Sequence, residues 1–406
     1  MDAEEAREKK RVNLADNPSN RAMVQRDLYL LPTEILLEIL SRLPVMSMIR
    51  FKSTSRAGRD LIADPRFPQM FHNRVSDSNP CLILFELNHY VVSSQPRQRY
   101  LVDRVDCSGR VRKIDPPRHS EGCSLVGDCN GLLCFSFPII GGSSRSCSLL
   151  IYNPLVGDAV TVPPANPPAN PPANPPANRF LFQFEVYGFG FHPRTGEFKV
   201  VRIVTVADPS VQVFTVGTTE WRNKGAPPQQ FGRGIEQAGA LVEGSLHWVT
   251  DVGMGGVGPI FGIFSFDLAD EMFEEIPHPP FQRLLSHRYC LFVLNGCLSA
   301  VGFVETGHLD IWVMEQYRVK ESWVKQFSFD PHSAPWPLNI SISIGFMCAL
   351  KNGEILLQYN DSVLVCYDPV ENRFKTLQIS GLPCKFRALP FLPSPFSAKA
   401  TMNLQF

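Results

Sequence analysis

The sequence predicts a small all-α module of three helices, followed by an all-β propeller of about six blades. Between residues 28 and 71, large apolar side chains recur with helical spacing and are punctuated by prolines. From residue 81 onward, short runs of Val, Ile, Phe, Leu and Tyr alternate with turns rich in Gly, Asn, Asp and Pro. This second pattern repeats at a period near 50 residues, which indicates an array of equivalent units.

The first helix of the module is predicted to follow Pro32 and to stop at Pro44. Pro suits the first turn of a helix, and Glu34 complements the positive helix end. At about 100° per residue, five apolar residues cover an arc of roughly 140°, and Leu37 sits apart from them. The arc contains Ile35, Leu36, Ile39, Leu40 and Leu43. Two further short helices are expected over 47–53 and 55–62, followed by Pro65, Phe67 and Phe71.

The module carries more large apolar side chains than three short helices can cover among themselves. A unit of about 44 residues is close to the smallest that folds unaided. An apolar arc wider than one helix face indicates burial on two sides, once internally and once against another protein. The alternative is that the following domain covers the surplus. Periodicity alone does not separate these two interpretations.

The module resembles the F-box, the motif that docks substrate receptors onto the Skp adaptor of cullin-based ubiquitin ligases. The resemblance is carried by LPTEILLEILSRLP at 31–44 and by Ser47, Arg50, Phe51, Lys52, Ser55 and Arg56. One residue departs from the family pattern: Gly58 stands where Trp is usual. This predicts a weaker third helix, because Gly costs about 1 kcal/mol relative to Ala in a helix interior. The resemblance implies adaptor binding by Leu31, Pro32, Ile35, Leu36, Ile39, Leu40, Leu43, Pro44, Met48, Arg50 and Phe51.

The repeated unit of the second part begins with a tight turn that leads into a hydrophobic strand. Such turns lie at Gly131, Gly244, Gly296 and Gly353, and a looser copy lies at Gly196. The intervals are 48 to 57 residues once the PPAN repeat at 163–178 is left out of the first one. This period is typical of four-stranded propeller blades of the kelch type, and residues 81–114 would supply a further blade.

Residues 81–390 as a whole resemble the kelch-like F-box-associated domain of plant F-box proteins. The markers, in order, are D-C-N-G-L-L, Y-N-P, Y-G-F-G-F, G-S-L-H-W and Y-D-P. The predicted organisation is a disordered lead at 1–27, the module at 28–71, a linker at 72–80, the propeller at 81–390 and a tail at 391–406. The PPAN repeat is expected to form an extended loop, because Pro donates no hydrogen bond to a sheet.

Composition bounds the class of protein. Lys plus Arg and Asp plus Glu both number 39, and this balance argues against a nucleic-acid-binding protein. No run of 18 apolar residues indicates a membrane-spanning helix, and the charged N-terminus is unlike a signal peptide. The expected location is therefore the cytoplasm or the nucleus. The eleven cysteines lie within hydrophobic runs and are interpreted as core thiols in a reducing compartment.

No catalytic or metal-binding pattern stands out, and no cofactor is expected. The nine histidines are scattered singly, and His247 is interpreted as a blade residue between Leu246 and Trp248. The run from Gly253 to Gly258 is interpreted as a flexible loop between strands, since no helix pattern or Lys follows it. Propellers also host copper and glycosidase sites, so an enzyme with a fortuitous helical leader remains an alternative hypothesis.

The resemblance implies a non-catalytic substrate receptor that binds a Skp-type adaptor, through it a cullin, and a target protein. A second alternative is an adaptor-binding protein that acts outside the ligase. Target recognition is assigned to four propeller loops of unusual composition, 224–234, 251–259, 281–288 and 330–338, at least two of them on one face. For Trp336 an equally weighted alternative is that its side chain closes one end of the propeller itself. The residues assigned to target binding are Phe231, Arg233, Met254, Arg283, Leu284 and Trp336.

Overall fold

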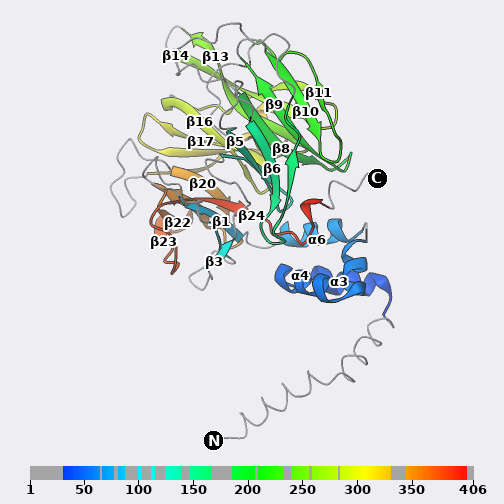
Figure 1. Cartoon of the computed structure of the whole chain (residues 1–406). Helices are drawn as coiled ribbons and strands as arrows, with labels where there is room; N and C mark the ends of the chain where they lie inside the picture. Colours follow the sequence, from blue (N-terminus) through cyan, green and yellow to red (C-terminus); the bar gives the residue numbers. More distant parts are fainter. Residues whose placement is uncertain are drawn as a thin grey trace, which may run out of the picture. The chain divides into compact units, whose positions relative to one another are not determined.

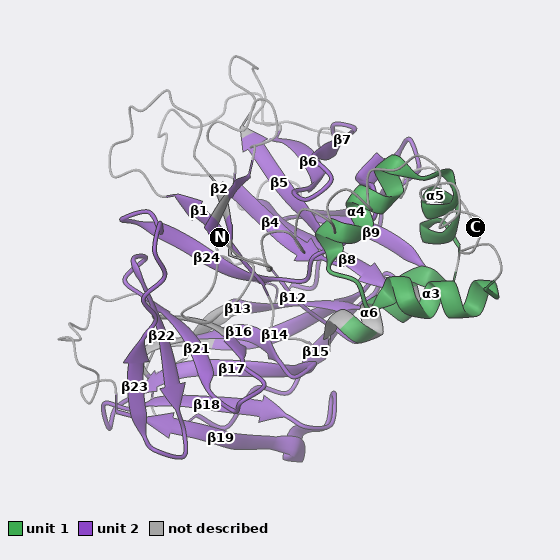
Figure 2. Cartoon of the chain, turned by 90° about the horizontal axis from the view of Figure 1, so that it is seen from below, with its two compact units in different colours: residues 1–78 green, residues 79–406 purple. Residues whose placement is uncertain are grey.

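The computed structural model confirms the predicted fold class, a helical module followed by a β-propeller. It describes residues 31–64, 66–76, 81–86, 99–102, 111–114, 124–138, 147–165, 185–205, 209–229, 231, 239–255, 258–281, 284–330 and 344–399. The chain divides into two compact units, residues 1–78 and 79–406 (Figure 2). The predicted lead at 1–27 and most of the PPAN repeat lie outside the described residues.

The described part of the first unit contains four helices, one more than the sequence predicted (Figure 1). They are α3 (Thr33–Ser41), α4 (Val45–Thr54), α5 (Arg56–Ile62) and α6 (Phe67–Ser76). Pro32 and Pro44 precede α3 and α4, and Ser55 caps α5 by accepting a hydrogen bond from the Gly58 amide at 3.2 Å. The linker predicted at 72–80 is wrong over its first half, because α6 continues through it to Ser76.

Helix α6 completes the core of the first unit. Its residues Phe67 and Phe71 are one turn apart, their rings stack with centroids 6.0 Å apart, and both are buried. They join apolar side chains from the other three helices. The buried set is Leu37, Leu40, Met48, Ile62, Phe67 and Phe71. A module that ended with α5 would lose one third of this set, which is why the fourth helix forms.

The described strands of the second unit form six antiparallel sheets of four strands each, in agreement with the predicted number of about six blades (Figure 1). The first three sheets, in spatial order, are β24-β1-β2-β3, β4-β5-β6-β7 and β11-β10-β9-β8. Their strands are β1 (Cys81–Glu86), β2 (Arg99–Val102), β3 (Val111–Ile114), β4 (Ser124–Cys129), β5 (Leu132–Pro138), β6 (Cys147–Asn153), β7 (Asp158–Val162), β8 (Glu185–His192), β9 (Glu197–Val204), β10 (Ser210–Thr215), β11 (Trp221–Asn223) and β24 (Phe386–Phe391).

The remaining three sheets follow the chain in order, β12 to β15, β16 to β19 and β20 to β23. Their strands are β12 (Ala240–Val242), β13 (Ser245–Gly255), β14 (Gly258–Asp267), β15 (Phe273–Ile276), β16 (Leu284–Leu294), β17 (Cys297–Val304), β18 (Leu309–Met314), β19 (Trp323–Phe329), β20 (Ile344–Ala349), β21 (Ile355–Tyr359), β22 (Val363–Asp368) and β23 (Arg373–Thr376). A short 3-10 turn at Lys320–Ser322 precedes β19.

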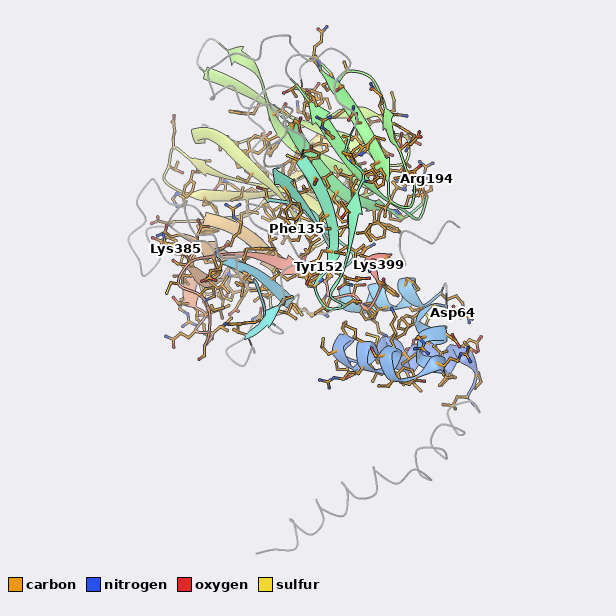
Figure 3. The ribbon with its side chains drawn as sticks, viewed as in Figure 1. Asp64, Phe135, Tyr152, Arg194, Lys385 and Lys399 are labelled. Carbon is orange, nitrogen blue, oxygen red and sulfur yellow. The ribbon has the colours of Figure 1, made fainter. Side chains whose placement is uncertain are left out.

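The sheets close into a ring through both ends of the propeller segment. The last strand, β24, pairs with the first, β1, with Leu84 opposite Ala388. Each pair of neighbouring sheets shares its own apolar cluster, and the described residues show six such clusters. In one of them, Ile83 of the first sheet packs with Phe135 and Tyr152 of the second (Figure 3 labels the two aromatic residues). Among the described residues, every pair of neighbouring sheets is therefore joined by an apolar cluster.

Two of the sequence markers pack against each other, which gives both a physical reason. In Y-G-F-G-F, a Cβ atom on Gly188 would lie 2.7 Å from Leu246 and from Trp248 of the marker G-S-L-H-W. Only a residue without a side chain lets β8 approach β13 this closely. The turn before the second marker needs Gly244 for a second reason, since its φ is +75°. These glycines therefore set the spacing between the third and fourth sheets.

Two stretches predicted as loops are largely strands. The stretch 251–259 lies mostly in the hairpin of β13 and β14, where only 256–257 fall outside the described residues, and 281–288 overlaps β16, which begins at Leu284. The two strands stay paired beyond a bulge between Asp251 and Gly253. The glycines of this stretch have low strand propensity, but the hydrogen bonds between β13 and β14 keep it in the sheet. The interpretation of 253–258 as a flexible loop is therefore wrong for its described part.

The described helices include none long and apolar enough to cross a membrane. The cysteines are only partly core thiols. Cys134 and Cys366 are buried as predicted, whereas Cys290 and Cys384 are exposed. Cys290 lies in the first strand of its sheet, where an apolar sequence context did not bring burial.

Candidate protein-binding surfaces

Helix α3 presents apolar side chains on two opposite sides. Leu37 and Leu40 are buried in the module, at 1% and 6% exposure. Ile35 and Ile39 lie on the other side and are 48% and 46% exposed. At about 100° per residue, Leu37 points roughly 180° away from the centre of the exposed side. The exposed row, one residue every fourth position, is Leu31, Ile35, Ile39 and Leu43.

This arrangement corrects the predicted stripe. The sequence placed Leu37 apart from the apolar arc, but it is a core residue of the module. Leu40, predicted to be shared between the module's core and the adaptor, is buried inside the module. Because every position from 35 to 40 except Glu38 is apolar, the average direction of the apolar residues did not show that they form two separate surfaces. The helix still has two apolar sides. The side with Leu37 and Leu40 is buried in the module, and the side with Ile35 and Ile39 is exposed.

Ion pairs join α3 to α6 beside the exposed row. Glu38 accepts hydrogen bonds from Arg42 and from Arg74 of α6, both at 2.5 Å. Glu34 pairs with Arg66 at 3.2 Å, and Arg66 also binds Asp64, labelled in Figure 3, at 2.9 Å. The hydrogen bond from Arg42 and the charge of Arg74 hold the pKa of Glu38 below its ordinary value. These partly exposed pairs fix the orientation of α3 more than they add to stability.

The remaining residues implied as adaptor contacts differ in exposure. Pro32, Pro44 and Arg50 are exposed, Leu36 and Phe51 are half-buried, and Met48 is fully buried. Phe51 lies against Gly58, where an added Cβ atom would be 2.6 Å from the ring. The residue that departs from the family pattern therefore allows α4 and α5 to pack closely. A Trp at this position would require Phe51 to move.

The residues assigned to target binding do not form one described cluster. Phe231 is 4% exposed and packs edge-on against Phe264 and Phe273, with centroids 5.8 and 5.3 Å away. Its assignment as an exposed contact is wrong, because the aromatic ring fills the space between two sheets. Leu284 is half-buried in the cluster between the fourth and fifth sheets. Arg233, Arg283, Trp336 and the side chain of Met254 lie outside the described residues.

Strand direction relates two of the four predicted recognition segments. In an antiparallel sheet of four strands, the second and fourth strands run in the same direction and end at one rim. β13 thus ends at Gly255 on the rim where β15 ends at Ile276. The chain then enters β16 at Leu284 after seven residues, 277–283. The end of β13 at Gly255, the start of β14 at Gly258 and the start of β16 are therefore placed at this rim, called here the β13 rim.

The buried polar groups of the propeller serve packing between sheets. His247 is 1% exposed, and its Nε2 lies 2.8 Å from the Tyr317 hydroxyl. Burial lowers the pKa of His247 to about 4, so the ring is neutral, donates from Nδ1 to the Ala240 carbonyl and accepts from Tyr317. This confirms His247 as a blade residue. Among the described residues, no three His, Cys, Asp or Glu side chains are grouped to hold a metal ion.

A second buried group joins the third and fourth sheets. Glu271, 6% exposed, accepts hydrogen bonds from Lys199 at 3.0 Å and from Arg222 at 2.5 Å, and pairs with Lys224 at 2.8 Å. Burial raises its pKa, but the hydrogen bonds from Arg222, Lys224 and Lys199 outweigh burial and hold the pKa at about 2. Three cations on one carboxylate suit an inter-sheet tie better than a catalytic acid or base, which needs a pKa near the working pH.

Sequence reasoning missed α6 and its ionic contacts to α3. The available signal was the spacing of Phe67 and Phe71, four residues apart, which places both on one helix face. Arg74, seven residues after Phe67, shares that side and reaches Glu38. This pattern was obscured because the two aromatics follow Pro65 and are interleaved with Pro68 and polar residues.

Comparison with known proteins agrees with both units. The family model for the F-box domain matches residues 28–70, and that for the F-box associated beta propeller domain matches residues 82–402. The Arabidopsis thaliana F-box protein At3g07870 is 32% identical over 411 residues, which cover 88% of this chain and 90% of that protein. F-box protein CPR1 from the same plant is 26% identical over 386 residues, covering 88% and 86%.

Solved structures offer only a distant likeness. A periplasmic gluconolactonase from Pseudomonas aeruginosa is 14% identical, with a TM-score of 0.37 over 73% of this chain and 82% of that chain. This score is too low to support any inference about activity.

Proposed function

Because this chain belongs to the F-box proteins that carry an F-box associated β-propeller domain, we propose that it is a substrate receptor of an SCF-type ubiquitin ligase. The observation that carries this proposal is the exposed apolar row formed by α3 and the residues that flank it. A folded module that leaves four large apolar side chains in one row presents a surface suited to a protein partner. In this role the row binds a Skp-type adaptor, which in turn binds a cullin.

Each residue of the row can contribute part of its burial energy to a contact. Burying one Leu or Ile side chain contributes about 1.5–3 kcal/mol relative to leaving it exposed. Leu31, Ile35, Ile39 and Leu43 are each between a third and a half exposed, so a docked partner gains only part of that amount from each. Arg50 is exposed on α4 and supplies a charged contact beside the apolar ones. Buried Leu40 and Met48 support the helices and are not proposed as contacts.

The propeller would hold the target protein. A receptor of this kind brings the target close to the ubiquitin-conjugating enzyme and forms no bond itself, so its contribution is effective concentration and orientation. The buried His247 and Glu271 support this non-catalytic role, since both are occupied in ties between sheets. For target contact we propose the β13 rim, where Met254 and the start of β16 support a shared recognition surface.

Adaptor binding is tested by purification of the full chain with a Skp-type adaptor and a cullin. The double substitution Ile35→Asp/Ile39→Asp is expected to abolish recovery of both partners, because two charges would enter an apolar contact. Val370→Asp is the matched control: Val370 is 89% exposed, lies in the propeller and is expected to leave recovery unchanged. Recovery of the adaptor without a cullin would favour a role outside the ligase. Undiminished recovery by the double variant would contradict the proposed docking row.

Target binding is tested separately, after proximity labelling in cells with proteolysis blocked has identified candidate targets. Met254→Asp at the β13 rim is then expected to weaken target capture by the full chain, whereas adaptor recovery stays normal. Val370→Asp again serves as the control. Equal target capture by Met254→Asp and the unchanged chain would refute the placement at this rim and leave the receptor role intact.

A further inference from the structure

The chain continues past the last propeller strand into a segment packed on the second sheet. Residues 392–399, called here the strap, follow β24 directly. The sequence interpreted 391–406 as a tail, and residues 400–406 lie outside the described residues. Within the strap, Ser394 and Ala398 are buried, at 3% and 1% exposure. Lys399, labelled in Figure 3, is its last described residue.

The strap is held by two side chains that flank the turn between β6 and β7. Asn153 is fully buried, and its Nδ2 donates to the carbonyl oxygens of Ser394 at 3.1 Å and Phe396 at 2.5 Å. Asp158 accepts hydrogen bonds from the Ser397 hydroxyl, from the Ala398 amide at 3.1 Å and from the Lys399 amide at 3.4 Å. Asn153 is the Asn of the Y-N-P marker, so this marker positions the strap.

Asn153 also shapes the turn that the strap covers. Its Oδ1 accepts from the amides of Leu155 at 2.9 Å and Val156 at 3.2 Å. The side chain thus uses both ends of its amide, one for its own turn and one for the strap. Loss of the strap would leave a buried amide donor without its two carbonyl partners, which is costly. The turn and the strap are therefore expected to order together.

The turn between β4 and β5 makes room for the strap. A Cβ atom on Gly131 would lie 2.2 Å from the Ser394 Cβ and 2.9 Å from the Leu392 carbonyl oxygen. The strap therefore passes directly over this turn, and any side chain at position 131 would block it. Further along, Ala398 enters the apolar cluster between the second and third sheets. From β24, the strap thus runs along one whole edge of the second sheet.

This course connects the strand that closes the ring, β24, to the neighbouring sheet. β24 belongs to the first sheet, whereas Asn153, Asp158 and Gly131 belong to the second. We propose that residues 392–399 are a latch that holds the first sheet to the second, and that a negative charge at Ser397 releases it. The charge sensitivity follows from geometry, because the Ser397 hydroxyl donates to the Asp158 carboxylate. A carboxylate in its place would meet a like charge at contact distance.

Hydrogen exchange in the full chain tests the latch. Removal of residues 392–406 is expected to raise exchange of β1 and β24 amides by about tenfold or more, with a smaller effect on β17 and β18. Removal of 400–406 alone is the matched control and is expected to change nothing. An equal rise in all six sheets would mean general stabilisation and would overturn the latch, as would unchanged exchange in β1 and β24.

Point variants keep the test valid if the truncated chain fails to fold. Ser397→Asp is expected to raise exchange of β1 and β24 amides several-fold more than Ser397→Ala, which removes only the hydrogen bond. Adding Asp158→Asn to Ser397→Asp is expected to return exchange to the level of Ser397→Ala, because the repulsion is gone. Equal exchange in Ser397→Ala and Ser397→Asp would refute the charge release. None of these measurements involves the adaptor, so their failure leaves the receptor proposal untouched.

Discussion

The helical module and the propeller treat their apolar side chains in opposite ways. The module buries one side of α3 and exposes the other as a continuous row. The propeller buries most of its large apolar residues between sheets, and those exposed among the described residues are scattered, such as Met272 and Val370 at turns and Val324 in β19. The difference indicates that a partner completes the packing of the module, whereas the propeller completes its own. Recognition by the propeller must then rely on loops rather than on an apolar row.

The largest expected effect comes from opening the core of the propeller. Trp248 is 2% exposed and fills the space above Gly188 and Gly239. Trp248→Ala is expected to lower the free energy of unfolding by about 3–5 kcal/mol, measured by urea denaturation. Val370→Ala, at an exposed turn, is the control and is expected to change it by less than about 0.5 kcal/mol. A small effect of Trp248→Ala would mean that sheets three and four do not depend on this contact.

The next effect separates the two sides of α3. Leu37→Ala is expected to destabilise the module by about 2–5 kcal/mol, as for a core leucine. Ile39→Ala is expected to leave stability within about 0.5 kcal/mol but to weaken adaptor binding by roughly ten- to a hundredfold. Thermal unfolding and titration calorimetry measure the two quantities on the same samples. If Ile39→Ala destabilises the module as much as Leu37→Ala, the two-sided description of α3 is incorrect.

A third effect concerns the contribution of the buried Glu271 carboxylate, which lies between the third and fourth sheets, to the stability of the propeller. The pKa of Glu271 is held near 2, below its ordinary value of 4.5, so its contribution is present above about pH 4.5 and is lost as the pH falls toward 2. A lowering of the pKa from 4.5 to about 2 corresponds to about 3 kcal/mol of stability. Glu271→Gln should therefore lose stability at pH 7 and show a shallower decline between pH 4.5 and 2. Parallel pH profiles for the two proteins would exclude this carboxylate as the source.

The smallest effect concerns the departure from the family pattern. Ala has a better helix propensity than Gly by about 1 kcal/mol, which favours Gly58→Ala. The new Cβ atom would, however, lie 2.6–2.8 Å from the Phe51 ring and carbonyl oxygen, and overpacking of this kind costs about 1–3 kcal/mol. A net loss of about 1 kcal/mol in module stability is expected from these opposing effects. Increased stability in thermal unfolding would show that Phe51 moves aside freely.

The repeated sequence units predicted the propeller well because each blade restates the same local pattern. Turns such as Asn295–Gly296, with φ of +51° and +81°, are fixed by the two residues themselves. The extension of β13 to Gly255 was not predictable in this way, because its glycines disfavour strands and only pairing with β14 makes them one. Burial of Phe231 likewise depends on aromatic partners more than 30 residues away.

In the module, periodicity located an apolar helix but not the side that faces inward. Ile35 and Leu37 have similar hydrophobicity, and only the positions of α4 to α6 decide which one is buried. The strap was missed for a related reason. Its sequence shows no periodic pattern, and its hydrogen bonds join residues about 240 positions apart.

The pairing of β1 with β24 has a consequence for biosynthesis. About 300 residues separate these two strands, and at roughly 5–20 residues per second a ribosome needs about 15–60 s to make them. Throughout that interval the nascent chain carries a finished F-box sequence but an unclosed ring, whose first strands lack their neighbour. A chain cut short between residues 77 and 385 thus keeps the F-box helices but lacks the strand that closes the propeller. If the F-box binds an adaptor as proposed, such a fragment would occupy the adaptor without a complete propeller.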